Sequence, residues 1–255
     1  MNGAWVTFKK ELLSYLVSPV GWVIAVVFYL WRGYEMAQEA ERFAVRRLDL
    51  DLFSTSSYGL PSTFLMVLLV PGVLTMRCFA EERRTGSIET LMTAPVRDGA
   101  VVVGKWGAAA VFFSLLWLPS IVVLWVLGFE PFFGVGLSFG PVIAAYLGMF
   151  LLSGMLLAFG CFASSLTDNL LLAALLAILF DFALLSLPRQ IAAGVSDLEN
   201  RYYLREILQK FDVAQNFADW FSRGLIDTSQ VAFYVGGVVF FLFLTTVSLS
   251  SRRYA

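Results

Sequence analysis

Residues 106–129 read WGAAAVFFSLLWLPSIVVLWVLGF and contain no charged side chain. A helix of about 20 apolar residues crosses the hydrocarbon core of a bilayer, so this stretch predicts a membrane span. Across the whole chain, 59% of the 255 residues are hydrophobic and 15% are charged. Soluble domains hold about a quarter charged residues. The composition therefore predicts a polytopic membrane protein.

Other uncharged runs predict five more spans, and the run in 169–188 is broken only by Asp181. The fourth span is rich in Gly, Ala and Ser, which let helices approach closely, so we expect it in the interior of the bundle. The predicted fold class is all-α, with one transmembrane domain over residues 1–255. The six predicted span cores are 17–32, 60–77, 104–127, 142–165, 169–187 and 230–250.

Six spans place both termini on one side of the membrane. Lys and Arg divide evenly between the two sides, but those on the side of the termini lie in short flanks beside the spans. The positive-inside rule applies to such short flanks. We therefore expect both termini in the cytoplasm.

An amphipathic segment precedes the first span. Trp5, Phe8, Leu12 and Leu16 recur at helical spacing, and the stretch ends at the dipeptide Ser18-Pro19. This pattern favours a helix in the headgroup layer, from which the chain turns into the membrane. A signal peptide is the alternative, but the apolar run is long and no small-residue cleavage site follows it.

Several function classes are excluded by residue counts. The net charge is -1, with 18 basic and 19 acidic residues, so the chain lacks the positive field that nucleic-acid binding needs. The sequence contains no His, which removes the commonest general base and metal ligand. Cys78 and Cys161 lie in apolar surroundings far apart in the sequence, which predicts neither a disulfide framework nor a metal site.

A charged loop follows the second span. Four charges, Glu81-Glu82-Arg83-Arg84, precede Thr85-Gly86-Ser87, which offers a turn and hydroxyl caps. Ile88, Leu91 and Met92 then fall on one helical face until Pro95. A short helix of this kind suits a groove in a partner protein, although a solvated connector has the same spacing.

Three segments resemble the ABC-2 type transporter permeases, in particular the branch named for bacterial gliding motility. Met76–Val96, MRCFAEERRTGSIETLMTAPV, resembles the coupling-helix region of that family. Phe8–Pro19, FKKELLSYLVSP, resembles its interfacial elbow helix, and Phe217–Arg253 resembles its last external segment and final span. The three matches occur in the order of the family, so the resemblance covers nearly the whole chain.

The resemblance implies a non-catalytic transmembrane subunit in the inner membrane of a bacterium. Such subunits pair as homo- or heterodimers, and a separate ATPase subunit binds ATP and Mg, so no cofactor or metal is expected in this chain. The substrate is not specified. An alternative is a non-transporting coupler or scaffold that passes ATP-driven motion to an envelope machine. The coupling interface implied here comprises Glu81, Glu82, Arg83, Arg84, Thr85, Gly86, Ser87, Ile88, Glu89, Leu91 and Met92.

One apparent nucleotide motif is rejected. Gly99–Lys105 fits the first seven positions of a P-loop, but Trp106 stands where Ser or Thr should bind magnesium. The stretch also enters an apolar span. We expect Lys105 to extend toward lipid phosphates instead.

The segment 188–227 shows two apolar helical patterns, broken near Asp212 and Gly224. In the resembled family, re-entrant helices at this place shape the outer gate, whereas a plain surface cap is the alternative. The implied gate residues are Phe217, Trp220, Phe221, Gly224 and Asp227.

Asp181 is the one carboxylate inside a predicted span, where ionisable groups are costly. It is a candidate for lining the translocation path or for a hydrogen bond across a dimer interface. The alternative is a hydrated side chain near the outer surface, or one bonded to a neighbouring Ser or Tyr.

Overall fold

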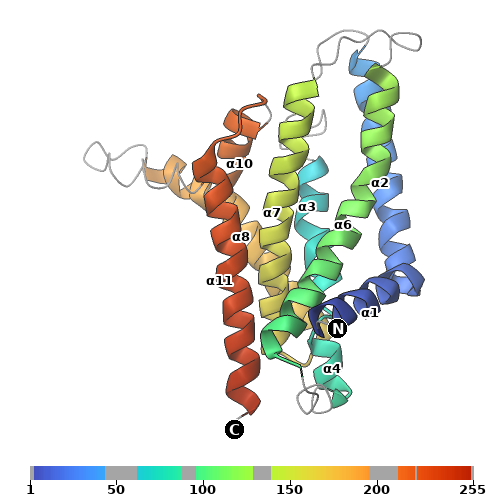
Figure 1. Cartoon of the computed structure of the whole chain (residues 1–255). Helices are drawn as coiled ribbons and strands as arrows, with labels where there is room; N and C mark the ends of the chain where they lie inside the picture. Colours follow the sequence, from blue (N-terminus) through green and yellow to red (C-terminus); the bar gives the residue numbers. More distant parts are fainter. Residues whose placement is uncertain are drawn as a thin grey trace.

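The computed structural model describes residues 3–43, 62–87, 96–128, 139–195, 212–221 and 223–253. All regular structure in these ranges is helical, as Figure 1 shows. The elements are α1 (Gly3–Val17), α2 (Pro19–Phe43), α3 (Ser62–Thr75), α4 (Ala80–Arg84), α6 (Asp98–Gly128), α7 (Phe139–Leu166), α8 (Leu170–Val195), α10 (Val213–Asn216), the π-helix η1 (Phe217–Phe221) and α11 (Thr228–Arg253).

Each of the six predicted spans overlaps a helix in the described part of the chain. Within the described residues, α6, α7, α8 and α11 are long and apolar enough to cross a membrane, and the bent pair of α1 and α2 adds a fifth candidate. The described part of α3 has 14 residues, so the count of six spans stays a prediction. Several helices run beyond the predicted cores, because hydropathy marks the lipid-buried stretch and not the helix ends: α2 continues to Phe43, and α8 continues through Pro188 to Val195.

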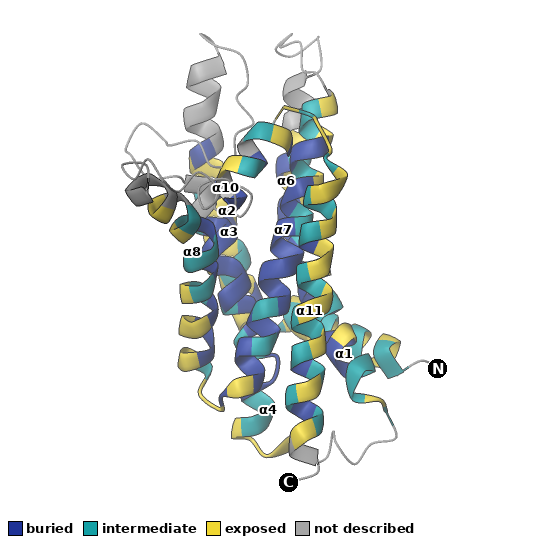
Figure 2. Cartoon of the chain, turned by 90° about the vertical axis from the view of Figure 1, so that its left-hand side faces the viewer, coloured by how far each residue is buried: buried dark blue, intermediate teal, exposed yellow. Residues whose placement is uncertain are grey.

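Helix α7 forms the centre of the bundle, as the prediction for the fourth span required. It packs against α11, α8, α3 and α6. Of its apolar span, 67% is buried, against 11% for α11, and Figure 2 shows this contrast. Glycines permit the close packing: a Cβ on Gly160 would lie 2.0 Å from the Thr75 hydroxyl oxygen on α3.

The predicted helix before the first span is confirmed as α1. The chain bends by 65° between α1 and α2, at Ser18, whose hydroxyl accepts a hydrogen bond from the Val20 amide. One side of α1 lies on α6, where a Cβ on Gly104 would be 2.7 Å from the Ala4 carbonyl oxygen. The apolar side chains of Leu13 and Val17 stay exposed, which leaves a face suited to lipid.

The two ends of the bundle carry different features. Both termini and α4 lie toward one end, and α10 lies toward the other (Figure 1). The charged loop after α3 and the segment before α11 are therefore separated by the length of the spans.

Candidate functional site

The loop after α3 begins with a tight turn and one helical turn. Helix α3 ends at Thr75, and α4 starts at Ala80 with two Glu in its first turn and two Arg in its last. This order of charges matches the helix dipole. Gly86 follows with a φ of 73°, a left-handed conformation that Gly adopts without strain.

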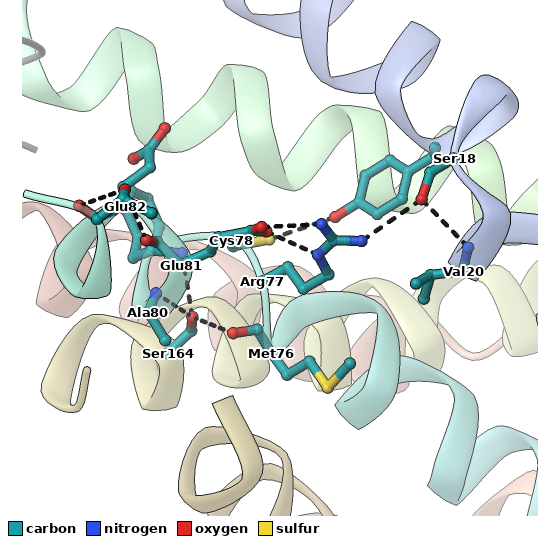
Figure 3. Close-up of polar contacts among 12 residues, drawn as sticks. Ser18, Val20, Met76, Arg77, Cys78, Ala80, Glu81, Glu82 and Ser164 are labelled. Carbon is teal, nitrogen blue, oxygen red and sulfur yellow. Dashed lines mark hydrogen bonds and ion pairs between the residues drawn. The ribbon is translucent and has the colours of Figure 1, made fainter. Parts of the chain in front are cut away.

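The start of α4 is capped from another helix. Its N-cap residue, Phe79, has no hydroxyl, and the cap is supplied by Ser164 on α7. The Ser164 hydroxyl accepts hydrogen bonds from the amides of Phe79 and Ala80, both 3.0 Å long, and donates one of 3.1 Å to the Met76 carbonyl (Figure 3). Helix starts need such partners for their free amides, so α7 fixes the position of α4.

Lys105 on α6 connects α1 and α4 near the start of α4. Its ammonium lies 3.1 Å from a carboxylate oxygen of Glu11 on α1 and 2.8 Å from one of Glu82 on α4. It also donates a 2.7 Å hydrogen bond to the Cys78 carbonyl. The side chain is 3% exposed. The expected extension of Lys105 toward lipid phosphates is therefore wrong: two protein carboxylates take that place, which a buried ammonium requires.

A second ion pair lies beside the first. Arg77 binds both carboxylate oxygens of Glu81, at 2.7 and 2.9 Å, and reaches the Ser18 hydroxyl at the bend before α2 (Figure 3). The hydrogen bond and charge of Arg77 lower the pKa of Glu81 below its usual value, so this carboxylate stays charged near neutral pH.

Tyr15 completes the arrangement from α1. Its hydroxyl donates a 3.0 Å hydrogen bond to the Leu74 carbonyl at the end of α3 and lies 3.5 Å from the Cys78 sulfur. We name the whole cluster the polar junction. It consists of Glu11, Tyr15, Arg77, Cys78, Glu81, Glu82, Lys105 and Ser164.

The polar junction contains only part of the predicted coupling interface. Glu81 and Glu82 belong to it, and Arg83 is half-buried. The next four residues are exposed: Arg84, Thr85, Gly86 and Ser87. Ile88, Glu89, Leu91 and Met92 lie outside the described residues. The loop thus presents a solvent-facing turn on a base that is tied to α1, α6 and α7.

Sequence reasoning missed the partners of this base. Lys105 at the start of an apolar span was a usable signal, because a buried ammonium must have carboxylates nearby. Its partner Glu11 stands 94 positions away in the chain, and nothing local to Ser164 marks it as the cap of another helix.

At the other end of the bundle, η1, which contains the predicted gate residues Phe217, Trp220 and Phe221, packs against α7. Phe217 and Phe221 are 0% exposed, and a Cβ on Gly148 of α7 would lie 2.5 Å from the Phe221 ring. Trp220 is partly exposed. Gly224 has a φ of 84° and packs against Pro141. Asp227 caps α11 by accepting hydrogen bonds from the amide and hydroxyl of Ser229.

Asp181 lies inside the protomer and is 0% exposed. It shares one face of α8 with the buried residues Ala177 and Leu185. Among the described residues, neither of its carboxylate oxygens has a hydrogen-bond partner. The alternative of a bond to a neighbouring Ser or Tyr is therefore not seen among the described residues.

Comparison with protein families shows which family the chain belongs to. Residues 5–252 match the family described as ABC-2 family transporter protein. A search of curated proteins found no match to this chain. Because the matched region spans nearly the whole sequence and contains several helices fit to cross a membrane, the chain belongs to the ABC-2 family and is a multi-pass permease component of an ABC transporter.

Proposed function

We propose that this chain is the transmembrane subunit of an ATP-driven exporter that receives its motion through loop 78–97. Family membership implies an ABC ATPase partner and a dimeric arrangement. The single observation behind the proposal is the polar junction, which attaches the base of that loop to α1, α6 and α7.

The junction suits force transmission because the side chains of Lys105 and Ser164 are buried and their bonds to neighbouring elements are 2.7 to 3.1 Å long. Ser164 holds the start of α4 on α7, and Lys105 holds Glu82 of α4 to α6 and α1. When a docked ATPase pushes the exposed turn at Arg84–Ser87, α4 passes the displacement to these helices together. Charges on the turn would set the register of docking, and inverting one of them would place like charges against each other, which costs several kcal/mol.

Two further sites belong to this proposal. Asp181 would line the translocation path when α8 moves away from α3 and α7, against which most of α8 packs. A hydrogen bond from Asp181 across a dimer interface would also require this movement of α8, because the side chain is buried now.

The outer gate would be formed by Phe217, Trp220, Phe221, Gly224 and Asp227. It packs against α7 through the contact of Phe221 with Gly148.

The remaining parts of the proposal concern the setting of the chain. We place it in a bacterial inner membrane with cytoplasmic termini, paired with a second permease subunit that is identical or different. The ATPase subunit binds ATP and Mg. The gliding-motility branch stays a prediction from resemblance.

The experiment is co-purification of the tagged chain with its cognate ATPase. Gly86→Pro removes the left-handed turn, since proline fixes φ near −65°, and Arg84→Glu inverts an exposed charge. Both should release the ATPase while the chain stays in the membrane. Arg223→Glu, an exposed change in the segment before α11, is the matched control and should retain it.

The outcomes separate the candidate functions. An ATPase that remains bound to both loop variants would contradict docking on loop 78–97. A complex that hydrolyses ATP in vesicles without moving any substrate would favour the non-transporting coupler.

A further inference from the structure

The two cysteines of the chain lie against each other. Cys78 is in the turn between α3 and α4, and Cys161 is on α7. Their sulfur atoms are 3.9 Å apart, with the Cys161 thiol donating to Cys78. Both are buried and free, and the sequence contains only these two. The pair thus connects the base of the charged loop to the central helix.

Close packing of α3 on α7 creates this contact. Gly160, the neighbour of Cys161, leaves room for Thr75 at a place where a Cβ would overlap it. Cys161 therefore lies beside a close approach of α3 to α7.

The surroundings favour reaction at Cys78. The hydrogen bond from Cys161 and the nearby Lys105 ammonium lower the pKa of the Cys78 thiol, and the Tyr15 hydroxyl lies 3.5 Å from its sulfur. Thiolate is the form that attacks oxidants and disulfides. Burial keeps oxidants away while the junction is closed.

We propose that Cys78 and Cys161 form a reversible disulfide site that takes small peroxides as its oxidant. The Cys78 thiolate attacks one oxygen of hydrogen peroxide and the O–O bond breaks, which gives a sulfenic acid, while the departing hydroxide takes up the proton that the thiol had lost and leaves as water. The Cys161 sulfur then attacks the sulfenic sulfur and expels a second water. Two thiols lose two electrons in total to one peroxide, and a dithiol reductant reverses the step.

The disulfide would lock the polar junction. It would tie the turn before α4 to α7 by a covalent bond, so that α4 could no longer move against the central helix. This consequence rests on the proposed function. On the cytoplasmic side of a membrane, thiols are kept reduced and disulfides act mainly in sensing, which suits a stress-dependent brake.

The first test detects the bond itself. Membranes containing the full-length chain are treated with hydrogen peroxide, with and without ATP, then denatured and labelled with a maleimide polymer that adds mass to each free thiol. We expect the wild type to lose both tags at the mass of a monomer and to regain them after dithiothreitol. Cys161→Ser is the control. It has one thiol, Cys78, and therefore cannot form a disulfide within one chain.

Two results would overturn the disulfide site. One is retention of both wild-type tags after prolonged exposure to hydrogen peroxide, with and without ATP. The other is tag loss found only in a cross-linked dimer.

A second measurement tests separately whether the disulfide locks the polar junction. Oxidation should reduce the ATPase turnover of the wild-type complex to that of the isolated ATPase, with no such loss in Cys161→Ser. A bond that forms without this reduction would keep the site and contradict the lock.

Discussion

At the scale of single residues, Lys105 has the largest expected effect on stability. Lys105→Met leaves Glu11 and Glu82 facing each other without the ammonium. Removing one partner of a buried ion pair costs about 3–5 kcal/mol, so the thermal unfolding midpoint of the purified chain should fall markedly. Adding Glu11→Gln and Glu82→Gln to Lys105→Met should restore much of the lost thermal stability. An unchanged midpoint for Lys105→Met would show that the ion pairs do not stabilise the fold.

The cap supplied by Ser164 gives a smaller, local prediction. Ser164→Ala removes an acceptor from two amides at the start of α4 and should cost about 1–2 kcal/mol, as the loss of a helix cap does. Ser153→Ala on the same helix is the control, since that hydroxyl bonds only carbonyls of its own helix. Thermal unfolding of the two variants checks the difference; equal losses would count against a special role for Ser164.

At the scale of elements, the contact of η1 with α7 depends on Gly148. Gly148→Ala places a methyl group 2.5 Å from the Phe221 ring, which forces η1 away from α7. We expect faster proteolysis within the segment 212–227 of the chain in its membrane. Phe221→Leu in the same chain should slow cleavage again by making room. Equal cleavage of the wild type and Gly148→Ala would contradict this packing.

The helices could be predicted from the sequence because lipid imposes a simple rule: long uncharged runs must become helices. The contacts between them could not. Glu11 and Lys105 meet across 94 positions, and Cys78 and Cys161 across 83, through a crossing that depends on Gly160. Such pairs follow from packing, which hydropathy does not encode. The charged start of the loop could be predicted as a candidate site, but its attachment to three helices could not.

At the scale of the whole molecule, the orientation in the membrane can be tested. In a variant without native cysteines, a cysteine at the exposed position Ser87 should react only with a reagent supplied from the cytoplasm. A cysteine at the exposed position Gln215 should react from the outside. Ser87 follows α4 and Gln215 lies in α10, and these two helices lie toward opposite ends of the bundle (Figure 1). Labelling of both from the same side would contradict the topology.

In the proposed function, the polar junction transmits motion between a docked ATPase and the spans. The most direct measurement is ATP hydrolysis by the complex in vesicles, comparing wild type with the Glu11→Gln, Lys105→Met, Glu82→Gln triple variant, in which all three charged groups of this ion-pair cluster are neutral. We predict that the triple variant still co-purifies with the ATPase but no longer raises its turnover above that of the ATPase alone. Full stimulation by the triple variant would contradict the claim.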